Sequence, residues 1–312
     1  MDGVFTELRP LLFSIAYRML GSVSDAEDIV QDAYLRYHGA LTDGIDIESP
    51  KAYLSAITTR LSIDLLRSAR HRRETYVGQW LPEPLLTDPG APDPAERSAQ
   101  ADSLSMAFLL VLERLGPVER AVLLLHDVFG YDFAEVASIV GKSPNTCRQV
   151  AVRARRHVNA ERPRFEVSPT RRDELADKFV AALSEGDVDG LVELLAADVV
   201  VTGDSGGMSP SWPRPIVGRD NVVRLLLGLA EQMRRAGVVR LERVEVNGQP
   251  GAVVRDADGG LVNVFSFDIV DGVVQAVRSV ISREKLRHLG PLADVPALMR
   301  ARQSAGEAEQ RP

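Results

Sequence analysis

The sequence predicts a multidomain protein in which two all-α helical modules precede a C-terminal α+β domain. Its 312 residues exceed what one hydrophobic core usually organises, so two or three domains are expected. Apolar residues recur at helical spacing up to about residue 164, apart from one proline-rich break. Alternating apolar and polar residues then form four short runs between residues 239 and 281, which is typical of strands.

Composition narrows the class of protein. The net charge of −7 argues against indiscriminate binding to nucleic acid. The only cysteine, Cys147, excludes an internal disulfide and a cysteine-based zinc site. No apolar run reaches the roughly 18 residues that span a bilayer, and the N-terminus lacks a secretion signal pattern. We therefore expect a cytoplasmic protein with no membrane contact, no metal and no cofactor.

The first helical module is expected over residues 1–73. Gly21 ends a first helix, and Ser24 and Glu27 have the spacing of a capping box that opens a second helix to about His38. A third helix is expected over residues 50–69. On the second helix three carboxylates line up opposite the apolar face, namely Asp25, Asp28 and Asp32. A solvated face is the simpler interpretation, and a docking surface for a basic partner is the functional one.

Arginines are concentrated on and after the expected third helix, at Arg60, Arg67, Arg70, Arg72 and Arg73. Such a cluster can hold phosphates and stack on unpaired bases. A solvated helix end favoured by the helix dipole explains the same pattern. The residues alone leave both interpretations open.

A proline-rich linker over residues 74–100 separates this module from a second helical module over residues 101–164. Within it, Asp132 and Glu135 form a capping box, Gly141 ends a short helix, and Ser143 can cap the next one. The result is a helix-turn-helix over residues 132–158. Its second helix places an apolar stripe opposite a polar face that carries Asn145, Arg148, Gln149 and Arg156, with Arg153 at the edge. This face offers donors for guanine, adenine and phosphate, whereas the alternative is a solvated basic helix.

The C-terminal domain is expected over residues 170–290, followed by a polar tail, 291–312. Two helices, a short strand and a further helix precede the four alternating runs. The dipeptides Asn247-Gly248, Asp258-Gly259 and Asp271-Gly272 are typical hairpin turns. This order predicts a curved sheet wrapped around helices.

Three segments together resemble the ECF class of bacterial sigma factors. The segment SDAEDIVQDAYLRYH is similar to region 2.2, and SPKAYLSAITTRLSIDLLRSARHRR to regions 2.3–2.4. The segment from Leu115 to Val158 is similar to region 4. The resemblance covers about half the chain, and the remainder resembles the sigma factors with a fused C-terminal SnoaL-like (NTF2-like), cone-shaped domain.

The resemblance implies roles for these residues. Asp25, Asp28 and Asp32 would dock core RNA polymerase at the β′ clamp helices, and region 4 would meet the β flap. The −10 element of promoter DNA would be contacted by Thr58, Thr59, Arg60, Asp64, Arg67, Arg70, Arg72 and Arg73. The −35 element would be read by Ser143, Asn145, Arg148, Gln149, Arg153 and Arg156. The expected function is transcription initiation, regulated in cis by the C-terminal domain.

Two family motifs and a linker motif imply the regulatory contact. The DGGGK motif stands here as Asp204-Ser205-Gly206-Gly207-Met208, and the NPDKL-like motif as Ser282-Arg283-Glu284-Lys285-Leu286. The linker carries YVGQWLPEP. The residues implied in regulation are Trp80, Pro82, Asp204, Gly206, Gly207, Lys285 and Leu286.

Some SnoaL-like domains are enzymes that use an acid/base pair. Here none of the five histidines lies between residues 175 and 281, and Asp204 is the best acid candidate. Without a convergent base, a structural role or the sensing of a small-molecule ligand is favoured, and no catalytic residue is expected. The alternative for the whole chain is a one-component DNA-binding regulator with a ligand-binding or enzymatic C-terminal domain, which would bind an operator without polymerase.

Overall fold

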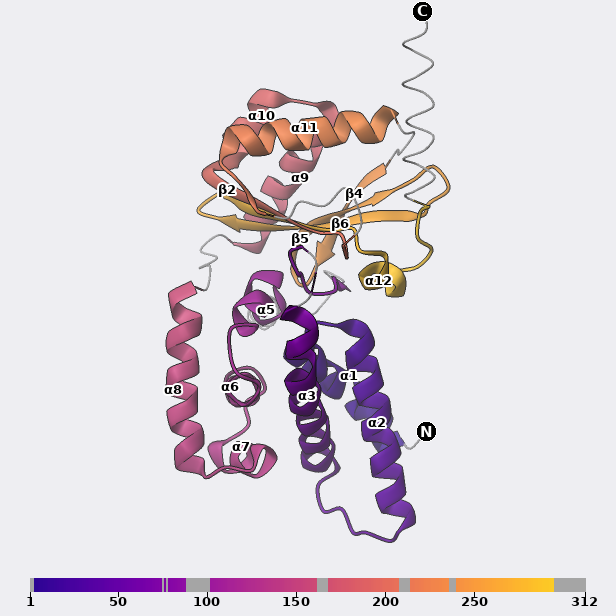
Figure 1. Cartoon of the computed structure of the whole chain (residues 1–312), viewed down its shortest axis with the longest axis vertical. Coiled ribbons are helices and arrows are strands. Elements are labelled where there is room, and N and C mark those ends of the chain that lie inside the picture. The colour runs from indigo at the N-terminus through magenta and orange to yellow at the C-terminus, as the bar shows by residue number, and fades with distance from the viewer. Residues whose placement is uncertain are drawn as a thin grey trace, which may run out of the picture. The chain divides into compact units, whose positions relative to one another are not determined.

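The computed structural model describes residues 3–74, 76, 78–87, 102–161, 168–207, 214–235 and 240–294 (Figure 1). The chain divides into two compact units. One combines residues 1–75 with 107–162, and the other combines 76–106 with 163–312. Most of the linker's proline-rich part, from residue 88, and the tail from residue 295 lie outside the described residues.

Three helices form the first module: α1 (Gly3–Leu20), α2 (Val23–Thr42) and α3 (Pro50–Glu74). Phe5 and Leu12 of α1 pack with Val30 of α2 and Leu54 of α3 in a buried core. The capping box expected at Ser24 is wrong. The N-cap is Ser22, whose Oγ accepts a hydrogen bond from the Asp25 amide at 3.1 Å. Gly21 has a φ of 66° that ends α1, so the chain enters the next helix directly at Ser22.

The second module contains α5 (Met106–Leu112), α6 (Pro117–Leu123), the π-helical turn η1 (Leu124–Val128), α7 (Phe133–Val140) and α8 (Pro144–Glu161). The helix-turn-helix is confirmed. The Asp132 carboxylate accepts from the amides of Ala134 and Glu135 at 2.8 Å, and Gly141 closes α7 in the left-handed conformation, φ 67°. Ser143 Oγ accepts from the Thr146 amide at 3.1 Å, which caps α8.

The C-terminal domain has the expected α+β architecture. Its helices are α9 (Pro169–Glu185), α10 (Val188–Leu194) and α11 (Arg219–Arg235), and a short α12 (Arg283–Leu286) leads into the 3₁₀ turn η2 (Arg287–Leu289). The strands are β1 (Leu86–Thr87), β2 (Leu195–Asp204), β3 (Ile216–Val217), β4 (Arg240–Val246), β5 (Gln249–Arg255), β6 (Leu261–Val270) and β7 (Val273–Val280).

Within the described residues a seven-stranded sheet runs in the order β1-β4-β5-β6-β7-β2-β3, in which β2 and β7 pair in parallel and the other neighbouring strands pair antiparallel. The helices α9, α10 and α11 lie over one face of it (Figure 1). Two hairpins turn as expected, because both residues of Asn247-Gly248 and of Asp271-Gly272 have positive φ. The edge strand β1 comes from the linker, which the sequence pattern does not predict.

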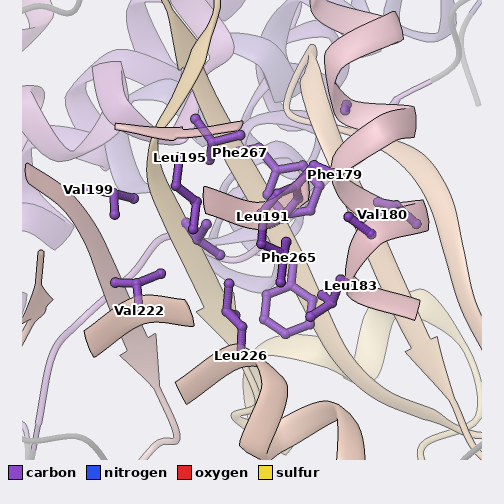
Figure 2. Packing of buried hydrophobic residues seen from close by; sticks show 14 of the residues in the cluster. Phe179, Val180, Leu183, Leu191, Leu195, Val199, Val222, Leu226, Phe265 and Phe267 are labelled. Atoms are coloured by element: carbon purple, nitrogen blue, oxygen red, sulfur yellow. The ribbon is translucent and has the colours of Figure 1, made fainter. Parts of the chain in front are cut away.

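The core of this domain lies between those helices and the sheet. Phe179 of α9 meets Phe267 of β6 edge to face, with 5.1 Å between ring centroids. Leu191 of α10 and Val222 of α11 are fully buried in the same cluster (Figure 2). This packing fixes the end of β2, where the polar residues of the candidate regulatory site begin.

Candidate functional site

The outer face of α8 is open to a partner. Its inner face is buried through Cys147, Val150 and Ala154. The residues expected to read the −35 element are all exposed, namely Ser143, Asn145, Arg148, Gln149, Arg153 and Arg156. A helix held down by small apolar residues and exposing polar donors has the form that enters a major groove.

Two arginines of α8 have partners that set their positions. Arg155 makes two hydrogen bonds to the Asp127 carboxylate, at 2.8 and 2.5 Å, which raise the pKa of its guanidinium. It braces α8 against η1. The guanidinium of Arg148 lies 5.4 Å from the ring centroid of Phe133, the first residue of α7. Arg148 is therefore steadied by stacking while it remains exposed.

The acidic face of α2 is exposed at Asp28 and Asp32, while Asp25 is half-buried in the first turn. Leu35 lies three positions beyond Asp32 on the same face and is 58% exposed. An uncovered leucine among carboxylates is typical of an interface centre with a charged rim. Sequence reasoning missed Leu35, although its position outside the helix's apolar stripe was a signal.

The residues expected to contact the −10 element do not share one environment. Thr58 and Thr59 are fully buried, whereas Arg60, Asp64 and Arg67 are exposed. Asp64 and Arg67 form an exposed ion pair at 3.2 Å. The side chains of Arg70, Arg72 and Arg73 lie outside the described residues. Arg60 donates to the carbonyl oxygens of Ser138 and Ile139 in α7.

The residues implied in regulation gather around the buried carboxylate of Asp204 at the end of β2. One oxygen accepts from Lys285 Nζ at 2.6 Å and from the Leu81 amide at 2.8 Å. The other accepts from the Tyr76 hydroxyl at 2.5 Å and from the Gly206 amide at 3.0 Å. Four donors occupy this carboxylate, so it acts as an anchor for the linker rather than as an exposed acid.

Lys285 is the second member of this cluster. Its ammonium also donates to the Leu81 carbonyl oxygen at 2.5 Å, and it lies 4.9 Å from the ring centroid of Tyr76 and 4.5 Å from that of Trp80. Burial, followed by the neighbouring Asp204 carboxylate, raises the pKa of Tyr76. Lys285 is thus the cation that pairs with the Asp204 carboxylate.

Glycine is required beside this cluster. Gly206 has a φ of 64°, and a Cβ there would lie 2.7 Å from Ser282 Oγ. Pro82 and Leu286 are buried, and each directly follows a residue of this cluster, Leu81 and Lys285 respectively. Gly207 also has positive φ. We call Tyr76, Trp80, Leu81, Asp204 and Lys285 the linker clamp.

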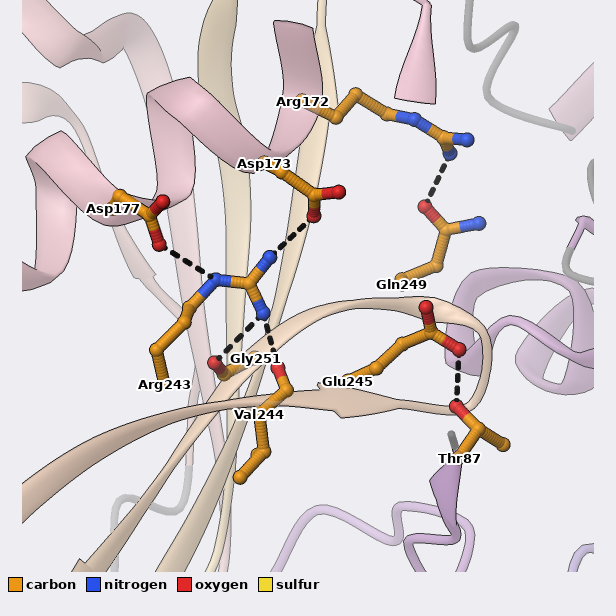
Figure 3. Close-up of polar contacts among 9 residues, drawn as sticks. All are labelled: Thr87, Arg172, Asp173, Asp177, Arg243, Val244, Glu245, Gln249 and Gly251. Atoms are coloured by element: carbon orange, nitrogen blue, oxygen red, sulfur yellow. Dashed lines mark hydrogen bonds and ion pairs between the residues drawn. The ribbon is translucent and has the colours of Figure 1, made fainter. Parts of the chain in front are cut away.

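A second attachment holds the linker to β4 and the following turn. Strand β1 pairs with β4, with Thr87 opposite Glu245 and their side chains joined at 2.6 Å (Figure 3). The side chain of Asn247 accepts from the Leu85 amide at 3.0 Å and donates to the Leu104 carbonyl oxygen at 3.1 Å. Beside it, Gln249 accepts from buried Arg172 at 2.7 Å. Asn247 is a functional candidate that hairpin propensity alone did not reveal.

Ion pairs stiffen β4 itself. Arg243 of β4 reaches α9, where it meets Asp173 at 2.5 Å and Asp177 at 3.4 Å (Figure 3). The same guanidinium donates to the carbonyl oxygen of Val244. These contacts tie the strand that receives the linker to the helical layer of the domain.

A cavity of about 590 Å³ lies at the C-terminal end of α9. Apolar side chains of α9, α11 and the sheet line it, including Leu183, Leu226 and Phe265, which point toward one another in Figure 2. Glu185, Glu231 and Arg240 also line it. Within the described residues, no group of acidic, histidine or cysteine side chains is arranged to hold a metal ion. Those residues also contain no helix long and apolar enough to cross a membrane.

Three family models match the chain. Residues 4–72 match Sigma-70 region 2, residues 105–158 match Sigma-70 region 4, and residues 176–274 match the SnoaL-like domain.

Curated relatives match almost the whole chain. The ECF RNA polymerase sigma factor SigJ of Mycobacterium tuberculosis is 43% identical over 90% of this chain and 91% of its own. The probable ECF RNA polymerase sigma factor SigI of the same species is 32% identical over 89% of this chain and 92% of its own. The crystal structure of M. tuberculosis SigJ superposes with a TM-score of 0.73 over 94% of this chain and 100% of that chain, at 36% identity.

Proposed function

The chain belongs to the ECF family of RNA polymerase sigma factors, and on this premise we propose how its surfaces divide the work of promoter recognition. The matches to both sigma regions carry the assignment to transcription initiation. We propose that Arg148 and Gln149, with the neighbouring exposed residues of α8, read the −35 element. Arg60 and the arginines that follow it would hold the −10 strand.

We propose that the acidic face of α2 docks core polymerase at the β′ clamp helices, while the second module meets the β flap. Exposed Asp28 and Asp32 supply charge, and Leu35 supplies the apolar centre. Because core polymerase lies in the cytoplasm, the protein would act there. No polymerase-independent operator is required by this arrangement.

Initiation can be tested without knowing the promoter. Run-off transcription with core polymerase on sheared genomic DNA, followed by mapping of RNA 5′ ends, should give a small set of shared upstream sequences. Leu35→Ser should lower transcript yield without changing those sequences, because it affects docking alone. Uniform initiation, or tight operator binding that is unaffected by polymerase, would contradict the proposal and favour a one-component regulator.

We further propose that the C-terminal domain regulates initiation in cis by holding the linker. The linker clamp and the Asn247 contacts attach the linker on both sides of residues 88–101. Since the linker joins the two sigma modules, its release would let them spread over both promoter elements. Lys285→Met should therefore change transcript yield, whereas Lys178→Met, an exposed lysine of α9, should not.

A small-molecule ligand of the C-terminal domain is the second candidate function, and the cavity supports it. Leu227, Leu229 and Leu241 line this cavity and are only half-buried, so an apolar molecule would gain by covering them. The volume lies within the range of drug-sized sites. A neutral apolar probe, N-phenyl-1-naphthylamine, should fluoresce with the protein and lose affinity in Leu227→Trp. Val217→Trp, at an exposed edge strand, is the matched control.

A further inference from the structure

The buried face of α3 that carries two residues of the proposed −10 site is unusually polar. Ser55, Thr58, Thr59 and Ser62 recur three, four and seven positions apart, which places them on one helix face, and each is fully buried. The hydroxyl groups of Thr58 and Thr59 have no hydrogen-bond partner in the described part of the chain.

Burying an unpaired hydroxyl costs about 1–3 kcal/mol. A face that stays buried permanently would be more stable with valine or alanine at these positions. Small hydroxyl side chains suit a face that also meets water or nucleic acid in another state of the protein.

The helix-turn-helix covers part of this face. Ser55 Oγ lies 2.8 Å from the hydroxyl of Tyr131, which is 5% exposed. Tyr131 directly precedes Asp132, the N-cap of α7. The ammonium of Lys51, one turn before Ser55 on α3, lies 5.6 Å from the centroid of the Tyr131 ring. The start of α7 is thereby fixed against α3.

Arg60 fixes the other end of α7. Its Nε donates to the Ile139 carbonyl oxygen at 2.9 Å, and its Nη2 donates to that of Ser138 at 2.8 Å. Both carbonyls belong to the last turn of α7, where a helix leaves acceptors without internal partners. The fork of one guanidinium therefore caps the first helix of the helix-turn-helix.

A third polar contact joins the same two modules. The guanidinium of Arg120, in α6, is 3% exposed and donates to the carbonyl oxygen of Met19 in α1. It also pairs with Glu113 at 2.9 Å, and burial lowers its pKa to about 9. Of these two contacts only the bond to Met19 crosses between the modules, so a buried cation loses one acceptor if the modules part while its pair with Glu113 remains.

We propose that Ser55, Arg60 and Tyr131 form a latch that closes the −35 module onto the −10 module in the free protein. In the closed state Arg60 caps α7 and the Thr58 and Thr59 hydroxyls are covered. Opening transfers Arg60 from backbone carbonyls to nucleic acid and exposes the hydroxyl face. The inference rests on the proposed −10 role of these residues, but the latch itself forms without DNA or polymerase.

The test uses the full chain with Ser55→Ala and Tyr131→Phe combined, since neither residue belongs to the proposed polymerase or DNA contacts. Hydrogen exchange of the free protein should accelerate about 3–10-fold in residues 54–63 of α3 and 133–140 of α7 together, as expected for one lost hydrogen bond. Tyr53→Phe, on the same helix, is the matched control and should leave both segments unchanged.

A second measurement separates latch opening from general loosening. The core polymerase concentration that gives half-maximal binding should fall about 3–10-fold in the double variant, because less free energy is needed to open it. Unchanged exchange in α3 and α7 would overturn the latch. Acceleration spread equally over α1 and α2, or weaker polymerase binding, would overturn it as well. If the unaltered chain initiates no transcription while the double variant still shows accelerated exchange in α3 and α7, the proposed −10 role fails and the latch stands.

Discussion

Replacing Lys285 with methionine removes the cation of the linker clamp while keeping an unbranched side chain. Asp204 is fully buried and would retain Tyr76, Leu81 and Gly206 as donors, but no positive charge. Breaking a buried ion pair at one partner typically costs 3–5 kcal/mol. Because three donors remain, we expect the lower end, about 3 kcal/mol.

The Leu81 amide is a direct reporter of this loss, since it donates to the same carboxylate oxygen as Lys285. If the free energy that protects the Leu81 amide falls by about 3 kcal/mol, its exchange rate should rise by roughly two orders of magnitude, at 1.4 kcal/mol for each tenfold change. Hydrogen exchange followed by NMR would measure it. Lys178→Met, which removes an exposed charge from the same domain, should change stability by less than about 0.5 kcal/mol.

A double-mutant cycle completes the test. Asp204→Asn combined with Lys285→Met should be less destabilising than the sum of the two single changes, because the second change no longer leaves a charge unpaired. Additive effects, or an unchanged Leu81 exchange rate in Lys285→Met, would refute the view that this ion pair holds the linker.

Three further outcomes are expected. Arg148→Ala should weaken promoter binding by about 1–3 kcal/mol with loss of −35 preference, and an unaltered preference in a binding-site selection would contradict base reading by this residue. Gly206→Ala should destabilise the C-terminal domain by about 1–3 kcal/mol in urea, because φ is positive and Ser282 crowds the new Cβ; Gly228→Ala, in open space on α11, should instead stabilise it by about 0.5–1 kcal/mol. Folding raises the pKa of Tyr76, so the folded chain keeps this proton to higher pH than the unfolded chain does. The contribution of Tyr76 to the free energy of unfolding is therefore fully present below pH ~10 and falls by up to ~1.4 kcal/mol per pH unit above it. Tyr76→Phe should flatten that alkaline decline in pH-dependent unfolding, and an identical slope would show that another group causes it.

Features that depend on neighbours in sequence were predictable. Asp132, Gly141 and Ser143 define α7 and the start of α8 through caps that act within four residues, so the helix-turn-helix could be placed to the residue. The same local reasoning gave the wrong N-cap for α2, where two serines were possible. Ser22 and Ser24 each precede an acid by three positions, and only the conformation of Gly21 decides between them.

Long-range contacts could not be derived from any period or spacing. Arg60 reads as a DNA contact from its charge, but its acceptors lie 78 and 79 residues away at the end of α7. The motif resemblance singled out Asp204 and Lys285, yet their pairing and the donation from Leu81 required the structure. A turn signal such as Asn247-Gly248 specifies backbone conformation and says nothing of what the asparagine side chain binds.

Asn247 determines how insertions and deletions in the linker would affect the protein. Its amide joins Leu85 to Leu104, so the intervening residues 86–103 begin and end at one side chain. The distance that the linker can span is then set by that junction and not by the number of residues in the loop. Insertions or deletions between residues 88 and 101 should leave the reach between the two sigma modules unchanged, since a longer closed loop costs only about 0.6 kcal/mol per doubling. Replacing Asn247 would make loop length matter, and the same insertions would then alter how far apart the modules can stand.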